Sequence, residues 1–197
     1  AILPGSRHSE VVKLLPVMLG AAEIISRGPE PVQFFLPLAS TLNAAFVQRI
    51  IGRHRVSVKI LQDDIYDAVA AADIAMVASG TATLETGLLN TPMVIIYKMS
   101  PLTYLIGRMI IRIKNNGLVN IIAGETIVTE LIQKEATPER LAAEIDAILA
   151  DPARRETMKR RLGGIREKLG SPGAAKRAAA IALEMMKRRT SAQGMAC

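Results

Sequence analysis

The chain has 197 residues, of which half are hydrophobic, and a formal net charge of +7 at pH 7. A chain of this length supports one substantial core or two small ones, and its apolar content excludes a largely disordered protein. The positive charge favours anionic partners such as phosphates, nucleic acid or an acidic membrane surface. A solvated basic face that binds nothing explains the same charge equally well.

Predicted strands and helices alternate from the first residue to residue 97. Strands are expected at residues 1–4, 32–39, 56–61, 74–78 and 92–97, with helices at 11–25, 42–51, 63–72 and 84–89. Continuous apolar strands separated by helices are typical of a parallel sheet covered on both faces. We therefore predict an α/β fold, with a Rossmann-like parallel sheet and helices on both of its faces.

The end of the chain has a different composition. Three basic helices are expected at residues 138–150, 152–169 and 173–189, separated by the breakers "DP" and "GSPG". The final residues, "TSAQGMAC", have no apolar periodicity and are expected to be frayed. We therefore divide the chain into a Rossmann-like domain over 1–135, C-terminal helices over 136–190 and a frayed tail over 191–197.

Two loops rich in small residues connect a predicted strand to a predicted helix. One is Gly5-Ser6-Arg7, and the other is Ser79-Gly80-Thr81-Ala82-Thr83 within "VASGTATLETGLLNTP". Ligands of parallel sheets bind beyond the carboxyl ends of strands, so the two loops are candidates for one pocket. Exposed backbone N–H groups and the Arg7 guanidinium would suit a phosphate. An ordinary tight turn and a solvated arginine are the alternatives.

Three further polar residues lie near these loops or in the apolar stretch 120–133. A carboxylate at Glu85 would gain nothing from a phosphate, so its expected partner is a pair of hydroxyl groups, such as those of a ribose. The alternative is a first-turn acid that complements the helix dipole. The amides of Asn120 and Gln133 are expected in caps or turns, and less often in contact with a base or sugar.

Several kinds of site are excluded by their missing motifs. Neither G-x-x-x-x-G-K-[ST] nor G-x-G-x-x-G occurs, which argues against a P-loop ATPase or a dinucleotide dehydrogenase. The histidines, His8 and His54, have no second histidine or cysteine at metal-ligand spacing. We therefore expect no metal and no cofactor.

Residues 102–116, "LTYLIGRMIIRIKNN", combine an apolar stripe with basic side chains. This composition predicts a helix that lies in a membrane interface. A core helix with snorkelling basic side chains is the alternative. The basic residues interrupt the apolar run too often for a membrane span.

The chain resembles the C-terminal half of the lipid-A-disaccharide synthase family in four stretches, "LPGSRHSEVVKLLPVML", "VASGTATLETGLLNTPMVIIYK", "LTY" and "NIIAGETIVTELIQ". More generally, Glu85 followed by Pro92 is similar to the nucleotide-sugar-binding half of GT-B glycosyltransferases. The resemblance implies an inverting, metal-independent hexosyltransferase. It would transfer diacylglucosamine from UDP to diacylglucosamine 1-phosphate, giving lipid A disaccharide 1-phosphate and UDP. In the family's "IVP-E" stretch, Thr129 replaces the usual proline.

The same resemblance implies roles for individual residues. Gly5, Ser6 and Arg7 would face the UDP pyrophosphate, with Arg7 as the catalytic cation. Ser79 to Thr83 would provide phosphate-binding N–H groups, and Glu85 would hold the ribose hydroxyls. Asn120 and Gln133 fall in a downstream motif assigned to substrate binding.

The resemblance also implies partners and a location. The acylated acceptor would bind to an N-terminal half, because this chain opens in mid-strand and is expected to be part of a longer protein. The enzyme would act in lipopolysaccharide synthesis as a peripheral protein on the cytoplasmic face of the inner membrane. Its C-terminal helices would exchange within a homodimer, and no nucleic acid would bind. The alternatives are a UDP-sugar epimerase half, and a non-enzymatic basic module that binds membrane or nucleic acid.

Overall fold

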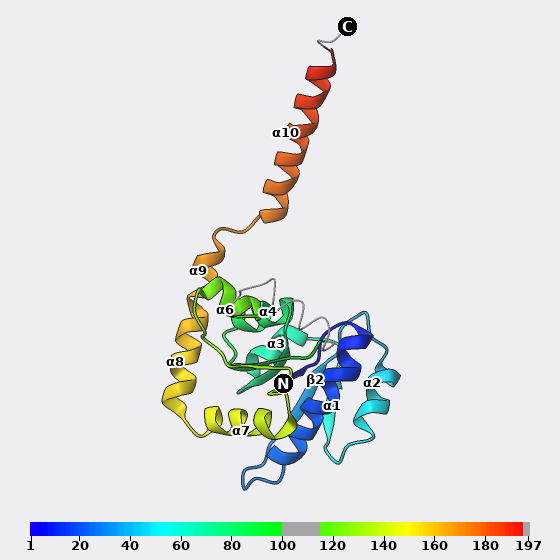
Figure 1. Cartoon of the computed structure of the whole chain (residues 1–197), viewed down its shortest axis with the longest axis vertical. Helices are drawn as coiled ribbons and strands as arrows, with labels where there is room; N and C mark the ends of the chain where they lie inside the picture. The colour runs from blue at the N-terminus through cyan, green and yellow to red at the C-terminus, as the bar shows by residue number, and fades with distance from the viewer. Residues whose placement is uncertain (100–114, 195–197) are drawn as a thin grey trace. The chain divides into compact units, whose positions relative to one another are not determined.

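The computed structural model describes residues 1–99 and 115–194, with side chains described as far as residue 186 (Figure 1). The predicted interfacial helix over 102–116 therefore falls almost entirely outside the described residues. The chain forms two compact units, Ala1–Ile165 and Arg166–Cys197. The first unit contains all of the described strands and the pockets discussed below.

The first unit is built on parallel strands. They are β1 (Ile2–Leu3), β2 (Phe34–Pro37), β3 (Val58–Leu61), β4 (Ala75–Ala78), β5 (Met93–Tyr97) and β6 (Glu130–Ile132). Hydrogen bonds join β1, β4, β5 and β6 in that order, and separately join β2 to β3. Since β1 also contacts β2, the strands follow one another as β3-β2-β1-β4-β5-β6, the order of a doubly wound fold. The predicted parallel arrangement is confirmed.

Helices cover the strands on both sides (Figure 1). They are α1 (His8–Ile25), α2 (Ala44–Ile51), α3 (Ile65–Ala71), α4 (Thr81–Leu88), α6 (Leu118–Ala123), α7 (Pro138–Leu149) and α8 (Pro152–Gly163). Helix α1 packs against α2 and α7, whereas α4 packs against α6 and α8. Val11, Leu15 and Met18, which recur at helical spacing in the first predicted helix, are buried in the core.

The helical end of the chain differs from its prediction in two respects. Helix α10 (Ala174–Gly194) extends to Gly194, so residues 191–194 of the tail expected to be frayed are helical, and the helix expected over 152–169 is broken. Residues 152–169 were expected to form one helix, but they form α8 and a separate α9 (Ile165–Leu169). Adjacent glycines at 163 and 164 explain the break, because glycine is a poor helix former. The second unit contains α10.

An ionised carboxylate joins α1 to the turn after α2. Glu23 accepts a 2.6 Å hydrogen bond from the Arg55 N–H, and its Oε1 lies 3.2 Å from His54 Nδ1. The Arg55 hydrogen bond and the neighbouring His54 hold the pKa of Glu23 below its usual value. A lowered folded-state pKa means that this stabilisation is present above the ordinary pKa and is lost as the pH falls.

We therefore expect Glu23→Gln to lower the free energy of unfolding at pH 7, and the difference from wild type to shrink below about pH 4.5. Urea unfolding of both proteins across this range measures the effect. Glu30→Gln is the control, because Glu30 is exposed and has no side-chain partner among the described residues. A difference that stays constant with pH would contradict the explanation.

Candidate functional site

A pocket of about 670 Å³ opens at the carboxyl ends of β1 and β4. These two strands are paired, with Leu3 beside Val77, so the loops that follow them lie next to each other. The lining comes from the loops after β1, β2 and β4, from the starts of α1, α3, α4 and α6, and from the segment before α6.

Most of the predicted site residues meet in this pocket. The predicted residues among those that line it are Gly5, Ser6, Arg7, Ser79, Gly80, Thr81, Ala82 and Glu85. Thr83, Asn120 and Gln133 are not among the lining residues. Parallel-strand geometry thus brings together two loops that are more than seventy residues apart.

The first turn of α4 presents unsatisfied backbone donors to the pocket. The N–H groups of Gly80, Thr81 and Ala82 have no acceptor within the part of the chain that the structure describes. Thr83 is fully buried, and both its N–H (3.2 Å) and its hydroxyl (2.8 Å) donate to the Gly80 carbonyl. Thr83 therefore stabilises the turn, while the three preceding amides and the helix dipole favour an anion.

Helix α4 begins earlier than expected, which explains where Glu85 lies. The helix starts at Thr81 rather than near residue 84, so Glu85 falls in its second turn. Its carboxylate is exposed and has no hydrogen-bond or ion-pair partner among the described residues. A free carboxylate beside unsatisfied N–H groups matches a ligand that carries both phosphates and hydroxyl groups.

The loop after β1 is shaped around a carboxylate that the sequence analysis did not identify. Arg7 precedes α1, and its Nη1 lies 2.8 Å from Oε1 of Glu10. Oε2 of Glu10 lies 3.4 Å from the Arg7 N–H. Gly5 has a φ of +100°, and a Cβ at this position would lie 2.5 Å from Glu10 Oε2. The glycine therefore provides both the backbone conformation and the space for this carboxylate.

A second carboxylate, which does not itself line the pocket, fixes the segment at Asn116 that does. Glu130, on β6, accepts hydrogen bonds from the N–H groups of Asn116 (2.7 Å) and Gly117 (3.0 Å). The Asn116 carbonyl in turn accepts the Ser79 hydroxyl at 3.0 Å, which joins this segment to the loop after β4. An acid inside the apolar stretch "TIVTELIQ" was the available signal for Glu130.

Asn120 and Gln133 make contacts within the fold. The Asn120 amide is buried, donates to Val128 O (2.9 Å) and Glu130 (2.8 Å), and accepts from the Ile127 and Val128 N–H groups. The Gln133 side chain accepts from the Met99 N–H at 2.9 Å and donates to the Met99 carbonyl at 3.4 Å. Both amides thus organise backbone segments, which is the commoner of the two roles expected for them.

The described residues contain no cluster of three or more His, Cys, Asp or Glu side chains that could hold a metal ion. Among the described lining residues, the charges at the pocket come from the side chains of Arg7, Glu10 and Glu85, together with the backbone dipoles.

The sequence profile of the lipid-A-disaccharide synthetase family matches residues 1–185. The chain belongs to this family. Lipid-A-disaccharide synthase of Syntrophus aciditrophicus is 54% identical over 189 residues, which cover 95% of this chain and 49% of that protein. The Geobacter metallireducens synthase is 44% identical over 188 residues, covering 95% of this chain and 49% of that protein. The chain spans about half the length of the curated relatives it matches.

Solved structures of glycosyltransferases share the fold. The calicheamicin glycosyltransferase CalG4 superposes with a TM-score of 0.54 at 18% identity, covering 92% of this chain and 40% of that chain. The glycotransferase of kitacinnamycin superposes with a TM-score of 0.54 at 19% identity, and the match covers 93% of this chain and 41% of that chain. These likenesses confirm the predicted fold class, a Rossmann-like half of the GT-B type.

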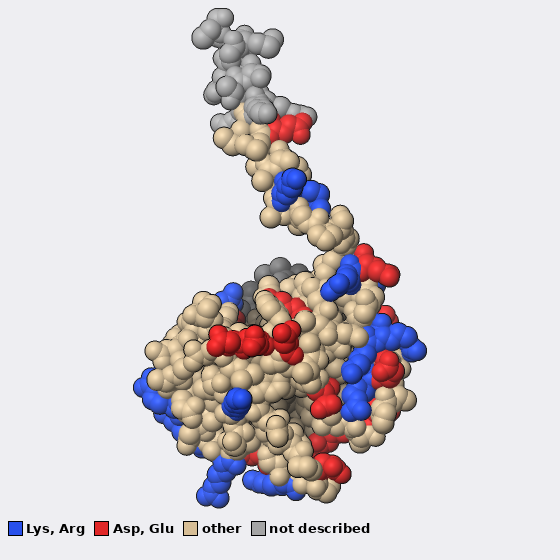
Figure 2. Space-filling view, turned by 180° about the vertical axis from the view of Figure 1, so that it is seen from behind, with Lys and Arg blue, Asp and Glu red and all other residues tan. Residues whose placement is uncertain are grey.

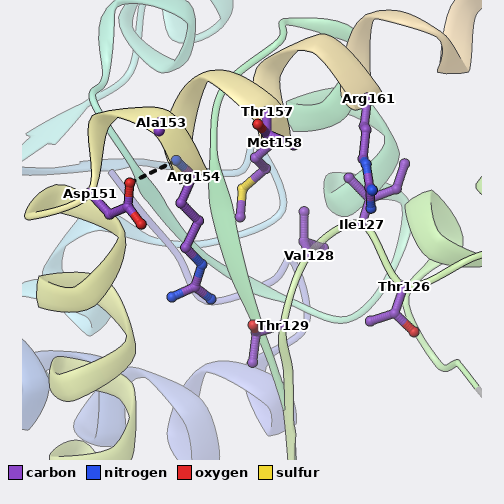
Figure 3. A pocket seen from close by; sticks show the side chains of 10 residues that line it. All are labelled: Thr126, Ile127, Val128, Thr129, Asp151, Ala153, Arg154, Thr157, Met158 and Arg161. Atoms are coloured by element: carbon purple, nitrogen blue, oxygen red, sulfur yellow. Dashed lines mark hydrogen bonds between the residues drawn. The ribbon is translucent and has the colours of Figure 1, made fainter.

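Thr129, where the chain departs from the family's "IVP-E" stretch, lines a second pocket of about 440 Å³ together with Arg154 of α8 (Figure 3). The Thr129 hydroxyl donates to Glu144 at 2.6 Å, and Glu144 also pairs with Arg154 of α8. A proline could not make this hydrogen bond. In this member of the lipid-A-disaccharide synthetase family, Thr129 therefore ties the segment before β6 to helices α7 and α8.

Proposed function

We propose that this chain is the donor-binding part of a lipid-A-disaccharide synthase. The whole enzyme would transfer diacylglucosamine from UDP-diacylglucosamine to an acylated sugar phosphate, releasing UDP. Support comes from membership of the family and from the names of relatives that match 95% of this chain. The chain spans about half of those relatives, so the acceptor is assigned to the other half.

The observation that carries the proposal is one pocket that holds three N–H groups and a carboxylate without partners among the described residues. The amides of Gly80, Thr81 and Ala82 would bind the diphosphate at the start of α4. Glu85 would accept hydrogen bonds from the ribose hydroxyls, because a carboxylate favours hydroxyl donors over phosphate oxygens. A nucleoside diphosphate sugar is the ligand class that satisfies both sets of groups.

Arg7 would supply the catalytic positive charge. When the bond between the sugar C1 and the β-phosphate oxygen breaks, the bonding electrons stay with the diphosphate, whose negative charge increases. A guanidinium and helix-terminal N–H groups that are already in place stabilise that charge more in the transition state than in the ground state. Gly5 and Ser6 would bring their backbone close to the same group. Thr83, Asn120 and Gln133 would act by supporting the pocket walls.

The proposed location is the cytoplasmic face of the inner membrane, with the protein bound peripherally. None of the described helices is long and apolar enough to cross a membrane. Figure 2 shows basic side chains gathered over α8, which carries Arg154, Arg155, Lys159, Arg160 and Arg161. Such a surface would be attracted to anionic lipids. Exchange of the C-terminal helices within a homodimer remains a prediction.

Calorimetric titration with UDP, GDP and inorganic pyrophosphate tests the donor site. We expect wild type to bind UDP and pyrophosphate but not GDP. Glu85→Ala should weaken UDP binding roughly tenfold without weakening pyrophosphate binding, because of these two ligands only UDP has a ribose. Arg7→Ala should weaken the binding of both UDP and pyrophosphate, because both carry the diphosphate.

Two exposed residues of α7, Glu139 and Arg140, provide matched controls. Glu139→Ala and Arg140→Ala remove the same charges at positions that do not line the pocket, and should leave both affinities unchanged. A folded wild-type chain that binds neither UDP nor pyrophosphate would contradict the proposal. Equal weakening of both ligands by Glu85→Ala would contradict the assignment of the ribose.

A further inference from the structure

Glu10 is a carboxylate on the wall of a pocket that is proposed to bind a diphosphate. Negative charge at this position opposes the binding of an anion. The other charged side chains among the described lining residues are Arg7 and Glu85, so Glu10 cancels the positive charge available there. Its presence needs a function that outweighs this electrostatic cost.

Both oxygens of Glu10 face Arg7. Oε1 lies 2.8 Å from the guanidinium Nη1, and Oε2 lies 3.4 Å from the backbone N–H of the same residue. The Gly5 backbone approaches Oε2 so closely that a Cβ would lie 2.5 Å away. The loop is therefore folded around the carboxylate, which places Glu10 between Gly5 and Arg7.

The ion pair with Glu10 uses only Nη1 of the Arg7 guanidinium. Arg7 Nε and Nη2 donate to no acceptor within the described residues, so one side of the planar fork stays available for a phosphate. The Arg7 side chain is 78% exposed, so few packing contacts restrict its rotamers. An anchored Arg7 has already lost rotational freedom before the ligand arrives, which reduces the entropic cost of binding.

We propose that Glu10 is a positioning residue that orients the Arg7 guanidinium for the diphosphate of the donor. This inference rests on the proposed function. It assigns Glu10 no contact with the ligand, and its effect passes entirely through Arg7. An exposed ion pair contributes little to stability, so the contribution of Glu10 should be greater for ligand affinity than for folding.

A double-mutant cycle tests whether Glu10 acts on ligand affinity through Arg7. UDP and pyrophosphate affinities are measured by calorimetry for wild type, Glu10→Ala, Arg7→Ala and the double variant. We expect Glu10→Ala to weaken both ligands about fivefold when Arg7 is present, and to have almost no effect when Arg7 is alanine. Glu10→Gln should recover part of the affinity, because its amide oxygen can still accept from Arg7.

Because Glu10 also accepts from the Arg7 N–H at the start of α1, Thr137→Ala serves as a control for the loss of a helix cap. The Thr137 side chain accepts from the Arg140 N–H at 3.2 Å at the start of α7, away from the pocket, so this variant loses a cap without altering Arg7. Its UDP affinity should equal that of wild type. The inference about Glu10, but not the proposed function, would be overturned by tighter or unchanged binding in Glu10→Ala. Equal weakening by Glu10→Ala with arginine and with alanine at position 7 would overturn it too. A wild-type chain that binds neither ligand would overturn the proposed function and this inference with it.

Discussion

Replacing Asn120 with alanine is expected to lower the free energy of unfolding by about 3 kcal/mol. The side chain is fully buried and makes four hydrogen bonds, two as donor and two as acceptor. Removing it leaves the Ile127 and Val128 N–H groups without this acceptor, and methyl-sized alanine cannot replace it. Unsatisfied buried groups cost more than the hydrogen bonds themselves contribute.

Urea denaturation at pH 7 measures the loss. Asn115→Ala is the matched control, because the Asn115 side chain accepts one exposed 2.9 Å hydrogen bond from the Thr126 hydroxyl. That variant should lose less than about 1 kcal/mol. Asn120→Asp should also be destabilised strongly, since it loses both donors and places a second carboxylate beside Glu130. A loss for Asn120→Ala no larger than for Asn115→Ala would show that the buried network contributes little.

Replacing Gly5 with alanine is expected to weaken UDP binding by at least roughly tenfold and to lower the free energy of unfolding by about 2 kcal/mol. The φ of +100° is costly for a residue with a side chain. The new Cβ would also lie 2.5 Å from Glu10 Oε2, which forces that carboxylate to move. Displacing Glu10 releases Arg7 from its anchored position, so affinity and stability should fall together.

Gly124→Ala separates the effect of backbone strain from the effect of displacing Glu10. Gly124 has a φ of +75°, and a Cβ at this position would meet nothing within 4 Å. This variant should lose only the part of the stability that comes from backbone strain and should keep its UDP affinity, as judged by urea unfolding and calorimetry. Combining Gly5→Ala with Glu10→Ala should restore part of the stability and none of the affinity. Unchanged UDP affinity in Gly5→Ala would contradict a role for this loop in the site.

The strands and helices could be predicted because their signals are local. The apolar runs that became β4 and β5 and the periodic face of α1 can be recognised without knowing what they pack against. The meeting of the loops after β1 and β4 was also predictable, because parallel strands present their carboxyl ends at one edge. The break between α8 and α9 was missed, although adjacent glycines were a visible signal.

The carboxylates at the pocket were harder to identify. Glu10 lies three residues after Arg7, a spacing at which helical side chains meet, so local reasoning could have found this pair. Glu130 lies fourteen residues from Asn116, and nothing in the sequence between them specifies that contact. The pairing of β6 with β5 brings the Glu130 carboxylate within hydrogen-bond distance of the Gly117 N–H.

By itself, the sequence determined the alternation of strands and helices, the two loops rich in small residues and the motifs shared with the lipid-A-disaccharide synthetase family. Each of these depends on residues close together along the chain. The tertiary structure decided which polar side chains face the pocket and which are used inside the fold. Glu85 has no partner within residues 1–99 and 115–194, whereas the amides of Asn120 and Gln133 bind backbone groups. Hydrogen-bond partners depend on distances that only the packed sheet and helices establish.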